Sequence, residues 1–191
     1  MILGITGGTG CGKTTLLACI REAGGVVMDC DAIYHELLRT DTAMLSAIEA
    51  RFPGTVEDGG RNLKKLGALV YRNPKALADL NAITHASVRR EVEKVLAQKP
   101  KLAAIDAIAL FESGLDSLCD ATVAVTAPME ERVRRLMARD SIPESYARSR
   151  IAAQHEENWF REKCTCTLEN NGTQAQFREK CLAFLRNLCI I

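Results

Sequence analysis

The stretch Gly7-Gly8-Thr9-Gly10-Cys11-Gly12-Lys13-Thr14 decides the fold of this chain of 191 residues. It fits the phosphate-binding pattern G-x-x-x-x-G-K-S/T without a mismatch. Its glycines let backbone N–H groups turn inward around phosphate oxygens, and a helix that begins near Lys13 directs its positive end at the same anion. Lys13 can bridge the β- and γ-phosphates, and the Thr14 hydroxyl can ligate Mg²⁺. The stretch therefore predicts a P-loop that binds a nucleoside triphosphate.

The flanking sequence supplies the context that this motif requires. Residues 2–6 predict a short buried strand, and residues 13–22 carry Leu16 and Ile20 on one helical face. Strand, loop and helix in this order disfavour a glycine-rich turn that matches by chance. The loop alone does not separate a kinase from an ATPase or a GTPase, but the guanine motifs N-K-x-D and D-x-x-G are absent from usable positions.

Further apolar strands alternate with helices along the chain. We expect these strands at residues 26–28, 102–110, 122–126 and 166–169. Because the interior strands are apolar throughout, they predict a parallel sheet with helices on both faces. The expected fold is the α/β three-layer sandwich of the P-loop NTPases, with a five-stranded parallel sheet.

The composition excludes several classes of protein. Hydrophobic residues make up 47% of the chain, which suffices for a sizeable core, and 25 Lys and Arg residues balance 24 Asp and Glu residues. This balance argues against a general nucleic-acid binder. No apolar run approaches the roughly 20 residues that span a bilayer, and a strand and P-loop occupy the place of a signal peptide. We therefore expect a cytoplasmic protein, with reduced cysteines because the 8 cysteines form no C-x-x-C pair.

Two aspartates lie where phosphate transfer could use them. The strand at residues 26–28 leads into Asp29-Cys30-Asp31, at the sheet edge where open α/β folds bind ligands. Asp31 can accept the proton of an attacking hydroxyl, or it can cap the helix expected at residues 32–38. Asp106 interrupts an apolar strand, where it joins either the Mg²⁺ site or a backbone hydrogen bond.

Arginines concentrate in the segment between the last two strands. Arg132, Arg135 and Arg139 follow the spacing i, i+3, i+7 and share one face of a helix expected at residues 129–140. Nucleotide kinases carry a mobile lid at this place, and a lid arginine can stabilise the transferred phosphoryl group. We assign that role to Arg139. The alternative is a solvated, charged helix face.

The chain resembles the dephospho-CoA kinase family in six blocks that follow one another in order. These blocks are the residues 4–15, 29–37, 80–85, 110–115, 135–154 and 170–172. The fourth block, Leu110-Phe111-Glu112-Ser113-Gly114-Leu115, is similar to the L-F-E-x-G-L turn of that family. The resemblance implies transfer of phosphate from ATP, with Mg²⁺, to the ribose 3′-hydroxyl of dephospho-CoA, which is the last step of coenzyme A synthesis.

The resemblance also implies a set of site residues. The residues expected to hold ATP are Gly8, Thr9, Gly10, Cys11, Gly12, Lys13, Thr14 and Thr15, with Asn171 and Gly172 near the adenine. The residues expected on the acceptor side are Asp31, His85, Leu110, Phe111 and Glu112. Lys13, Asp31 and Arg139 are the expected catalytic residues. Independently of the resemblance, the P-loop pattern and the place of Asp106 in a strand make Thr14 and Asp106 the expected metal ligands.

The same resemblance implies one kinase domain over residues 1–191. The expected core comprises residues 1–40, 100–128 and 164–191, with a helical insertion on the CoA side at 41–99 and a lid at 129–163. We expect a small-molecule substrate as the partner, without nucleic acid or membrane, and a monomer or a small homo-oligomer.

The chain departs from the family at three places. Ile108-Ala109 replaces Pro-Leu, Ala86 replaces Pro, and Leu63 stands where the family favours Arg. If that arginine contacts the acceptor, then Arg61, Lys64 or Lys65 must take its place. A kinase for another nucleoside or nucleotide remains an alternative, as does a non-catalytic ATP sensor, although a sensor needs neither Asp31 nor an arginine lid.

Overall fold

The computed structural model describes residues 1–57, 60–61, 63–71, 73–188 and 190, which form two compact units. The sheet unit comprises Met1–Met28 and Pro100–Ile191, and the helical unit comprises Asp29–Lys99. The helical unit begins at Asp29 and not at residue 41, so the segment 29–40 groups with the insertion and not with the core. The structure thus divides the chain where the sequence placed an insertion, with an earlier first boundary.

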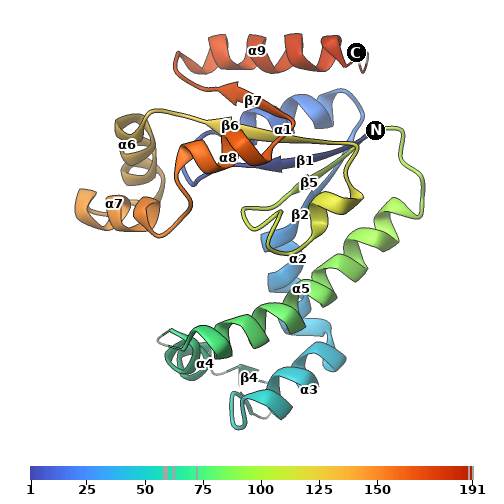
Figure 1. Ribbon diagram of the computed structural model, residues 1–191, viewed down its shortest axis with the longest axis vertical. Helices are drawn as coiled ribbons and strands as arrows, with labels where there is room; N and C mark the ends of the chain where they lie inside the picture. The colour runs from blue at the N-terminus through green and yellow to red at the C-terminus, as the bar shows by residue number, and fades with distance from the viewer. Residues whose placement is uncertain (58–59, 62, 72, 189, 191) are drawn as a thin grey trace. The chain divides into compact units, whose positions relative to one another are not determined.

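A five-stranded sheet forms the centre of the sheet unit (Figure 1). Its strands, in the order β2-β5-β1-β6-β7, are β2 (Val26–Asp29), β5 (Ala103–Asp106), β1 (Ile2–Thr6), β6 (Ala121–Thr126) and β7 (Cys166–Glu169). The central strand β1 pairs in parallel with β5 and β6, and β6 pairs in parallel with β7. The sheet confirms the five-stranded α/β fold expected from the sequence and places the P-loop at its centre.

The third predicted strand is shorter than the sequence indicated. It was expected over residues 102–110 but ends at Asp106, which lies beside Ile5 of β1. Strand β1 ends one residue later, and the P-loop replaces the partner that a longer β5 would need. Asp106 is therefore the last residue of the strand and not an interior one.

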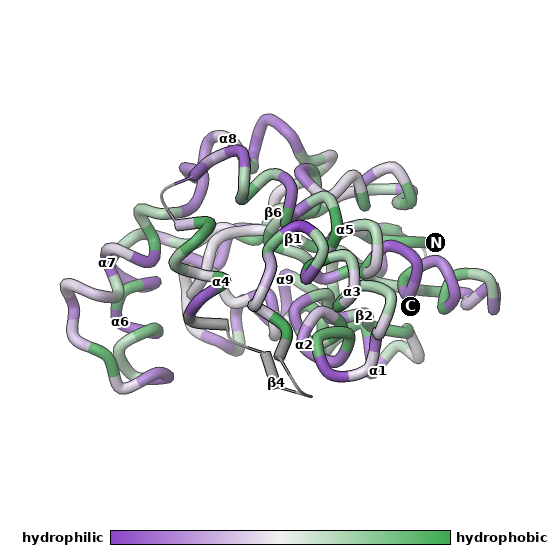
Figure 2. Tube along the Cα trace, turned by 90° about the horizontal axis from the view of Figure 1, so that it is seen from below, coloured by the Kyte–Doolittle hydropathy of each residue, from purple (hydrophilic) through white to green (hydrophobic). Residues whose placement is uncertain are grey.

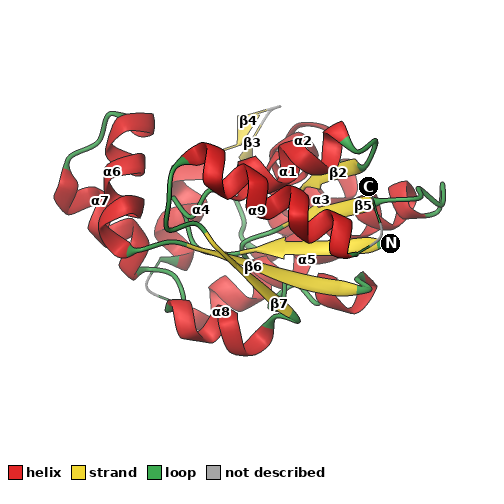
Figure 3. Ribbon diagram, turned by 90° about the horizontal axis from the view of Figure 1, so that it is seen from above, coloured by secondary structure: helices red, strands yellow, loops and turns green. Residues whose placement is uncertain are grey.

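Helices α1 (Lys13–Glu22) and α9 (Gln174–Asn187) pack together over one face of the sheet (Figure 3). Their buried side chains, including Leu16, Ile20 and Phe177, share a core with Leu3 and Val123 of the strands. Thr173 begins α9 with a capping box, in which its hydroxyl accepts from the Gln176 N–H while the Gln176 side chain accepts from the Thr173 N–H.

The segment after β5 carries Leu110 and Leu115, both buried, and the short 3₁₀ helix η1 (Leu115–Leu118). The Thr6 hydroxyl donates to the Ile108 carbonyl at 3.1 Å, which fixes this segment beside the end of β1. The fourth family-like block is thereby held next to the strand that leads into the P-loop.

The expected lid consists of three helices, namely α6 (Met129–Asp140), α7 (Glu144–Ala152) and α8 (Glu157–Lys163). Val133 and Leu136 of α6 pack against Ala147 and Ile151 of α7 in a small separate core. Figure 2 shows hydrophilic and hydrophobic residues mixed along both helices, in keeping with their many arginines. The pair α6–α7 therefore has its own apolar contact.

The helical unit is built along the long helix α5 (Pro74–Leu96), which Asn73 caps by accepting from the Ala76 N–H at 3.0 Å. Around it lie α2 (Cys30–Thr40), α3 (Thr42–Arg51) and α4 (Leu63–Val70), with a small hairpin of β3 (Val56–Glu57) and β4 (Gly60–Arg61). None of the described helices is long and apolar enough to cross a membrane.

Replacing Phe177 tests the packing of α9 on the sheet. Phe177 is 1% exposed in the main core, so Phe177→Ala should lower the free energy of unfolding by about 3–5 kcal/mol. Glu179→Ala, an exposed position on the same helix, should change it by less than about 0.5 kcal/mol. Equilibrium urea unfolding of both variants measures the difference, and equal small losses would contradict the packing described.

Candidate nucleotide-binding site

The P-loop joins the end of β1 to the start of α1. Gly7, Gly10 and Gly12 have positive φ values of 130°, 80° and 95°, and Gly12 is the N-cap of α1. A side chain at Gly12 would be strained in this left-handed conformation, and glycine brings no side chain to cap the helix. The first N–H groups of α1 therefore remain directed towards the loop, where an anion can bind them.

Three carbonyl groups of the loop are held from outside by side chains. Arg132 Nε donates to the Thr9 oxygen at 3.0 Å, Arg135 Nη1 to the Gly10 oxygen at 3.2 Å, and Asn170 Nδ2 to the Cys11 oxygen at 2.9 Å. In a trans peptide the C=O and the following N–H point in opposite directions. Holding the Thr9 and Cys11 carbonyls outward therefore turns the N–H groups of Gly10 and Gly12 inward, as a phosphate nest requires.

Positive charge surrounds this nest. The ammonium group of Lys13 donates to the Gly7 oxygen at 3.0 Å, so it reaches back across the loop. Burial raises the pKa of the Cys11 thiol, although the charges of Arg132 and Lys13 oppose the rise. A neutral thiol leaves the positive charge of the loop undiminished for a triphosphate.

The three arginines of α6 occupy different environments. Arg132 is 6% exposed and Arg135 is half-buried, and both contact the loop, whereas Arg139 is exposed. Arg139 lies seven residues after Arg132, roughly 10 Å further along the helix axis. The sequence placed all three on one face, but only the first half of α6 reaches the loop.

Arg139 instead pairs with Asp140 through two hydrogen bonds of 2.7 and 2.9 Å. Arg150 of α7 donates to the same carboxylate at 2.6 Å. The hydrogen bond from Arg139, with that from Arg150, lowers the pKa of Asp140 to about 2. The proposed phosphoryl-binding residue therefore lies in an ion-pair cluster between α6 and α7.

The metal candidates lie on two elements of the sheet unit. Thr14 is exposed in the first turn of α1, and the Oδ1 atom of Asp106 is buried at the end of β5. A hydroxyl and a carboxylate are oxygen ligands that suit Mg²⁺ when nucleotide phosphates complete its shell. Among the described residues no group of three or more His, Cys, Asp or Glu could hold a metal by itself.

Gln154 and Asn170 are site residues to which the sequence analysis gave no role. Gln154 Oε1 accepts from the Thr9 N–H at 2.7 Å, and Asn170 is 5% exposed beneath the loop. Asn170 follows β7 directly, so the rule that ligands bind at the carboxyl ends of parallel strands could have found it. The orientation of the Gln154 side chain depends on how the end of α7 packs, and no sequence pattern predicts that packing.

The Leu110-Phe111-Glu112 turn meets the junction between α7 and α8. His155 Nε2 lies 2.7 Å from Glu112 Oε1, and the His155 ring stacks on Trp159 with centroids 3.8 Å apart. The Phe111 ring meets Trp159 edge-on at 5.6 Å. Leu110 is fully buried, so it supports the turn from within the core and does not face solvent. The end of the expected lid thus contacts the turn that is expected on the acceptor side.

Comparison with known proteins decides the family. The family model described as "Dephospho-CoA kinase" matches residues 1–176. The chain belongs to the dephospho-CoA kinase family. A relative from Geobacillus kaustophilus named dephospho-CoA kinase is 35% identical over 97% of this chain and 96% of its own length. One from Latilactobacillus sakei with the same name is 31% identical over 98% of this chain and 95% of its own.

Solved structures agree with the fold. The crystal structure of TT1252 from Thermus thermophilus is similar with a TM-score of 0.82 and 34% identity, covering 98% of this chain and 97% of that one. Dephospho-CoA kinase from Campylobacter jejuni is similar in fold, with a TM-score of 0.69 and 22% identity over 98% of this chain and 96% of that one. Both comparisons span both units.

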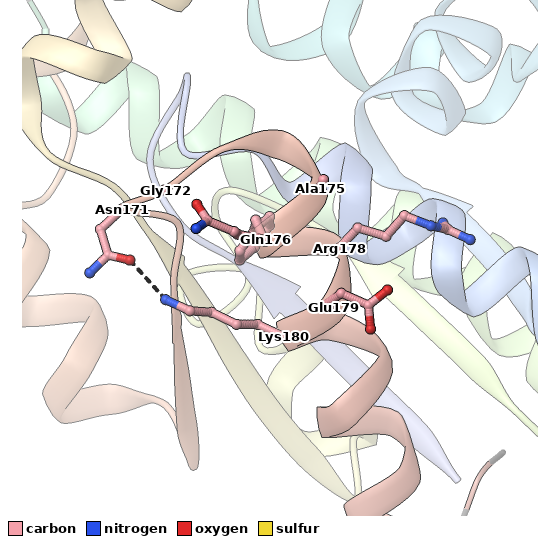
Figure 4. Close-up of a pocket in the computed structure, with 8 residues that line it drawn as sticks. Asn171, Gly172, Ala175, Gln176, Arg178, Glu179 and Lys180 are labelled. Carbon is pink, nitrogen blue, oxygen red and sulfur yellow. Dashed lines mark hydrogen bonds between the residues drawn. The ribbon is translucent and has the colours of Figure 1, made fainter.

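In this dephospho-CoA kinase family member, Asn171 and Gly172 line a surface cavity of about 690 Å³ at the start of α9 (Figure 4). The other residues that line it are Ala175, Gln176, Phe177, Arg178, Glu179 and Lys180. The Lys180 ammonium donates to the Asn171 side-chain oxygen at 2.8 Å. The expected adenine-side residues are thus exposed, whereas their neighbour Asn170 contacts the loop.

Two expected acceptor residues belong to the helical unit. Asp31 is exposed in the first turn of α2, and His85 is half-buried on α5. The helix begins at Cys30, and Asp29 caps it by accepting from the Ala32 N–H at 3.0 Å. The alternative that Asp31 is the cap is therefore wrong.

Of the possible substitutes for the family arginine at Leu63, only Lys65 has a described side chain. Its ammonium group donates to the Gly54 oxygen at 2.7 Å. The side chains of Arg61, Leu63 and Lys64 lie outside the described residues.

Asn170 and Asn171 give a matched test of which asparagine supports the nucleotide site. Asn170→Ala removes the donor to the Cys11 carbonyl and should weaken ATP binding roughly tenfold, because a loop peptide loses its orientation. Asn171→Ala should weaken it less, by about threefold or under. Isothermal titration calorimetry with ATP measures both, and the reverse order of losses would contradict the contacts described.

Proposed function

We propose that this protein transfers the γ-phosphoryl group of ATP to the ribose 3′-hydroxyl of dephospho-CoA and so produces coenzyme A. The observation that carries the proposal is a P-loop whose carbonyls are held outward by buried side chains, in a chain of the dephospho-CoA kinase family. Such a loop positions a triphosphate, and membership of the family indicates dephospho-CoA as the phosphate acceptor.

The loop and Lys13 form the donor half of the proposed site. The inward N–H groups hold the phosphates, while the Lys13 ammonium exchanges its Gly7 carbonyl partner for phosphate oxygens. Mg²⁺, which would neutralise charge on the phosphates, would be held by the oxygens of Thr14 and Asp106, either directly or through water.

Asp31 is the proposed base of the acceptor half. Its carboxylate accepts the proton of the 3′-hydroxyl as that oxygen attacks the γ-phosphorus and ADP leaves. Because Asp29 performs the capping of α2, the Asp31 carboxylate is available for this task. His85 of the helical unit and Phe111 and Glu112 of the sheet unit are the other proposed acceptor-side residues, and the buried Leu110 supports the turn that carries Phe111 and Glu112.

Arg139 is proposed to stabilise the charge of the transferred phosphoryl group. To do so, its guanidinium would exchange Asp140 for phosphate oxygens, and Arg150 would remain to pair with that carboxylate. In this exchange Arg139 pairs with Asp140 when the lid is open and with the phosphate oxygens when the lid is closed. We also propose a cytoplasmic enzyme that acts on a small-molecule substrate as a monomer or a small homo-oligomer.

A coupled assay of ADP release tests the function against its alternatives. The protein with ATP and Mg²⁺ should release ADP with dephospho-CoA and not with adenosine or AMP. Turnover of AMP but not of dephospho-CoA would contradict the proposed acceptor. Normal ATP binding without turnover of any of the three would instead indicate an ATP sensor.

Lys13→Ala should abolish phosphate transfer, because the β- and γ-phosphates lose their only loop ammonium group. Arg21→Ala removes an exposed positive charge from the same helix and serves as the control. Initial rates at saturating dephospho-CoA compare the two variants. Equal rates for Lys13→Ala and the control would refute the role of Lys13.

Asp31→Asn should lower kcat by about 10²- to 10⁴-fold with little change in ATP affinity, because it removes a base and not a nucleotide contact. Asp29→Asn is its matched control, since Asn also caps helices well and should leave kcat close to the wild-type value. Steady-state kinetics together with ATP titration separate the two effects. Weaker ATP binding at an unchanged kcat in Asp31→Asn would show that the assignment is wrong.

A further inference from the structure

Arg132 is a buried cation at the first turns of the lid. Its residue is 6% exposed, and its guanidinium donates to the Thr9 oxygen at 3.0 Å and to Gln154 Oε1 at 3.4 Å. Both acceptors are neutral oxygens. Arginine does not lose its proton in proteins, so this side chain carries a full positive charge against the P-loop.

The other arginines of the same helix each have a carboxylate. Arg134 and Arg135 face Glu131, and Arg139 pairs with Asp140. Across the described part of the chain, Arg132 forms no ion pair with an acidic side chain. A buried charge is costly unless an opposite charge or a full set of hydrogen bonds compensates it. The charge of Arg132 therefore calls for an anion at the loop.

The backbone at the loop is shaped to receive this guanidinium. A Cβ atom placed on Gly8 would lie 2.2 Å from Arg132 Nη2, so a larger residue here would displace the end of the Arg132 side chain. The next residue is held on both sides, because the Thr9 N–H donates to Gln154 at 2.7 Å while its carbonyl accepts from Arg132. Arg132 of α6 and Gln154 of the junction between α7 and α8 thus fix the two peptide groups on either side of Thr9.

We propose that Arg132 is a positioning residue of the nucleotide site, whose charge is compensated by the triphosphate of ATP. It orients the loop through the Thr9 carbonyl and adds positive potential behind the nest, without touching the reacting atoms. The proposal rests on the proposed function only in taking ATP as the ligand. It follows that ATP stabilises the protein partly by compensating Arg132, and that the cost of this charge falls on the ATP-free protein.

Arg132→Gln removes the charge and retains an amide donor. Its affinity for ATP should fall roughly tenfold, that for ADP less, and that for adenosine not at all, because the lost interaction is with phosphate charge. The melting temperature of the ATP-free variant should equal or exceed that of the wild type. Arg132→Lys, which keeps the charge, should recover most of the ATP affinity.

Arg134→Gln is the matched control, since it removes an exposed positive charge from the same helix. Titration calorimetry with ATP, ADP and adenosine, together with thermal unfolding with and without ATP, measures these effects without an acceptor. These measurements can therefore support or overturn the role of Arg132 even if the wild type does not phosphorylate dephospho-CoA.

A structural role for Arg132 predicts a different pattern. Arg132→Gln would then unfold at a lower temperature than the wild type without ATP, and its affinities for ATP and for adenosine would fall by the same factor. This result would overturn the proposal. Unchanged ATP affinity overturns it as well. If Arg132→Gln does not fold, the charge is needed for stability and the proposal fails, unless Arg132→Lys folds and retains the wild-type preference for ATP over adenosine.

Discussion

The outward hold on the P-loop carbonyls is the interaction on which the nucleotide site depends. A glycine-rich loop has many conformations, and only some of them direct N–H groups at an anion. Here the side chains of Arg132, Arg135 and Asn170 donate hydrogen bonds to the loop carbonyls. They leave the N–H groups of Gly10 and Gly12 free to face an anion. Two of these donors come from the lid helix α6 and one from the residue after β7. The loop is thus shaped by elements more than 100 residues away in sequence, which explains why this motif needs the whole sheet unit to become a site.

The junction between α7 and α8 contacts both the P-loop and the turn at residues 110–112, which is proposed for the acceptor side. Gln154 accepts from the P-loop at Thr9, and the next residue, His155, contacts Glu112 of the acceptor-side turn. The stack of His155 on Trp159 of α8 adds an aromatic contact that stabilises this junction. A movement of the lid would therefore act on the ATP loop and on the acceptor turn together. Such a connection would let acceptor binding influence how the loop holds the γ-phosphate.

The sequence predicted the backbone well because local patterns determine it. The strands at residues 2–6 and 166–169 and the helices at 13–22 and 129–140 occur as expected. The strand expected at 102–110 was too long, because apolar residues continue after Asp106 while the partner strand β1 does not. The helical period placed Arg132, Arg135 and Arg139 on one face, yet it does not tell which end of that face meets the loop. Gln154 likewise depends on how the junction between α7 and α8 packs, which no local pattern records. Asn170, directly after β7, and Asp29, three residues before the N–H that it caps, were within reach of local rules.

The central claim is that the N–H groups of Gly10, Gly12, Lys13 and Thr14 face a bound triphosphate. Backbone amide NMR of the labelled protein during titration with ATP and Mg²⁺ tests it most directly. We expect these four amides to show the largest shifts in the chain and to be protected from hydrogen exchange by ATP. Saturable ATP binding that leaves these amides unshifted, with the largest changes elsewhere in the chain, would contradict it.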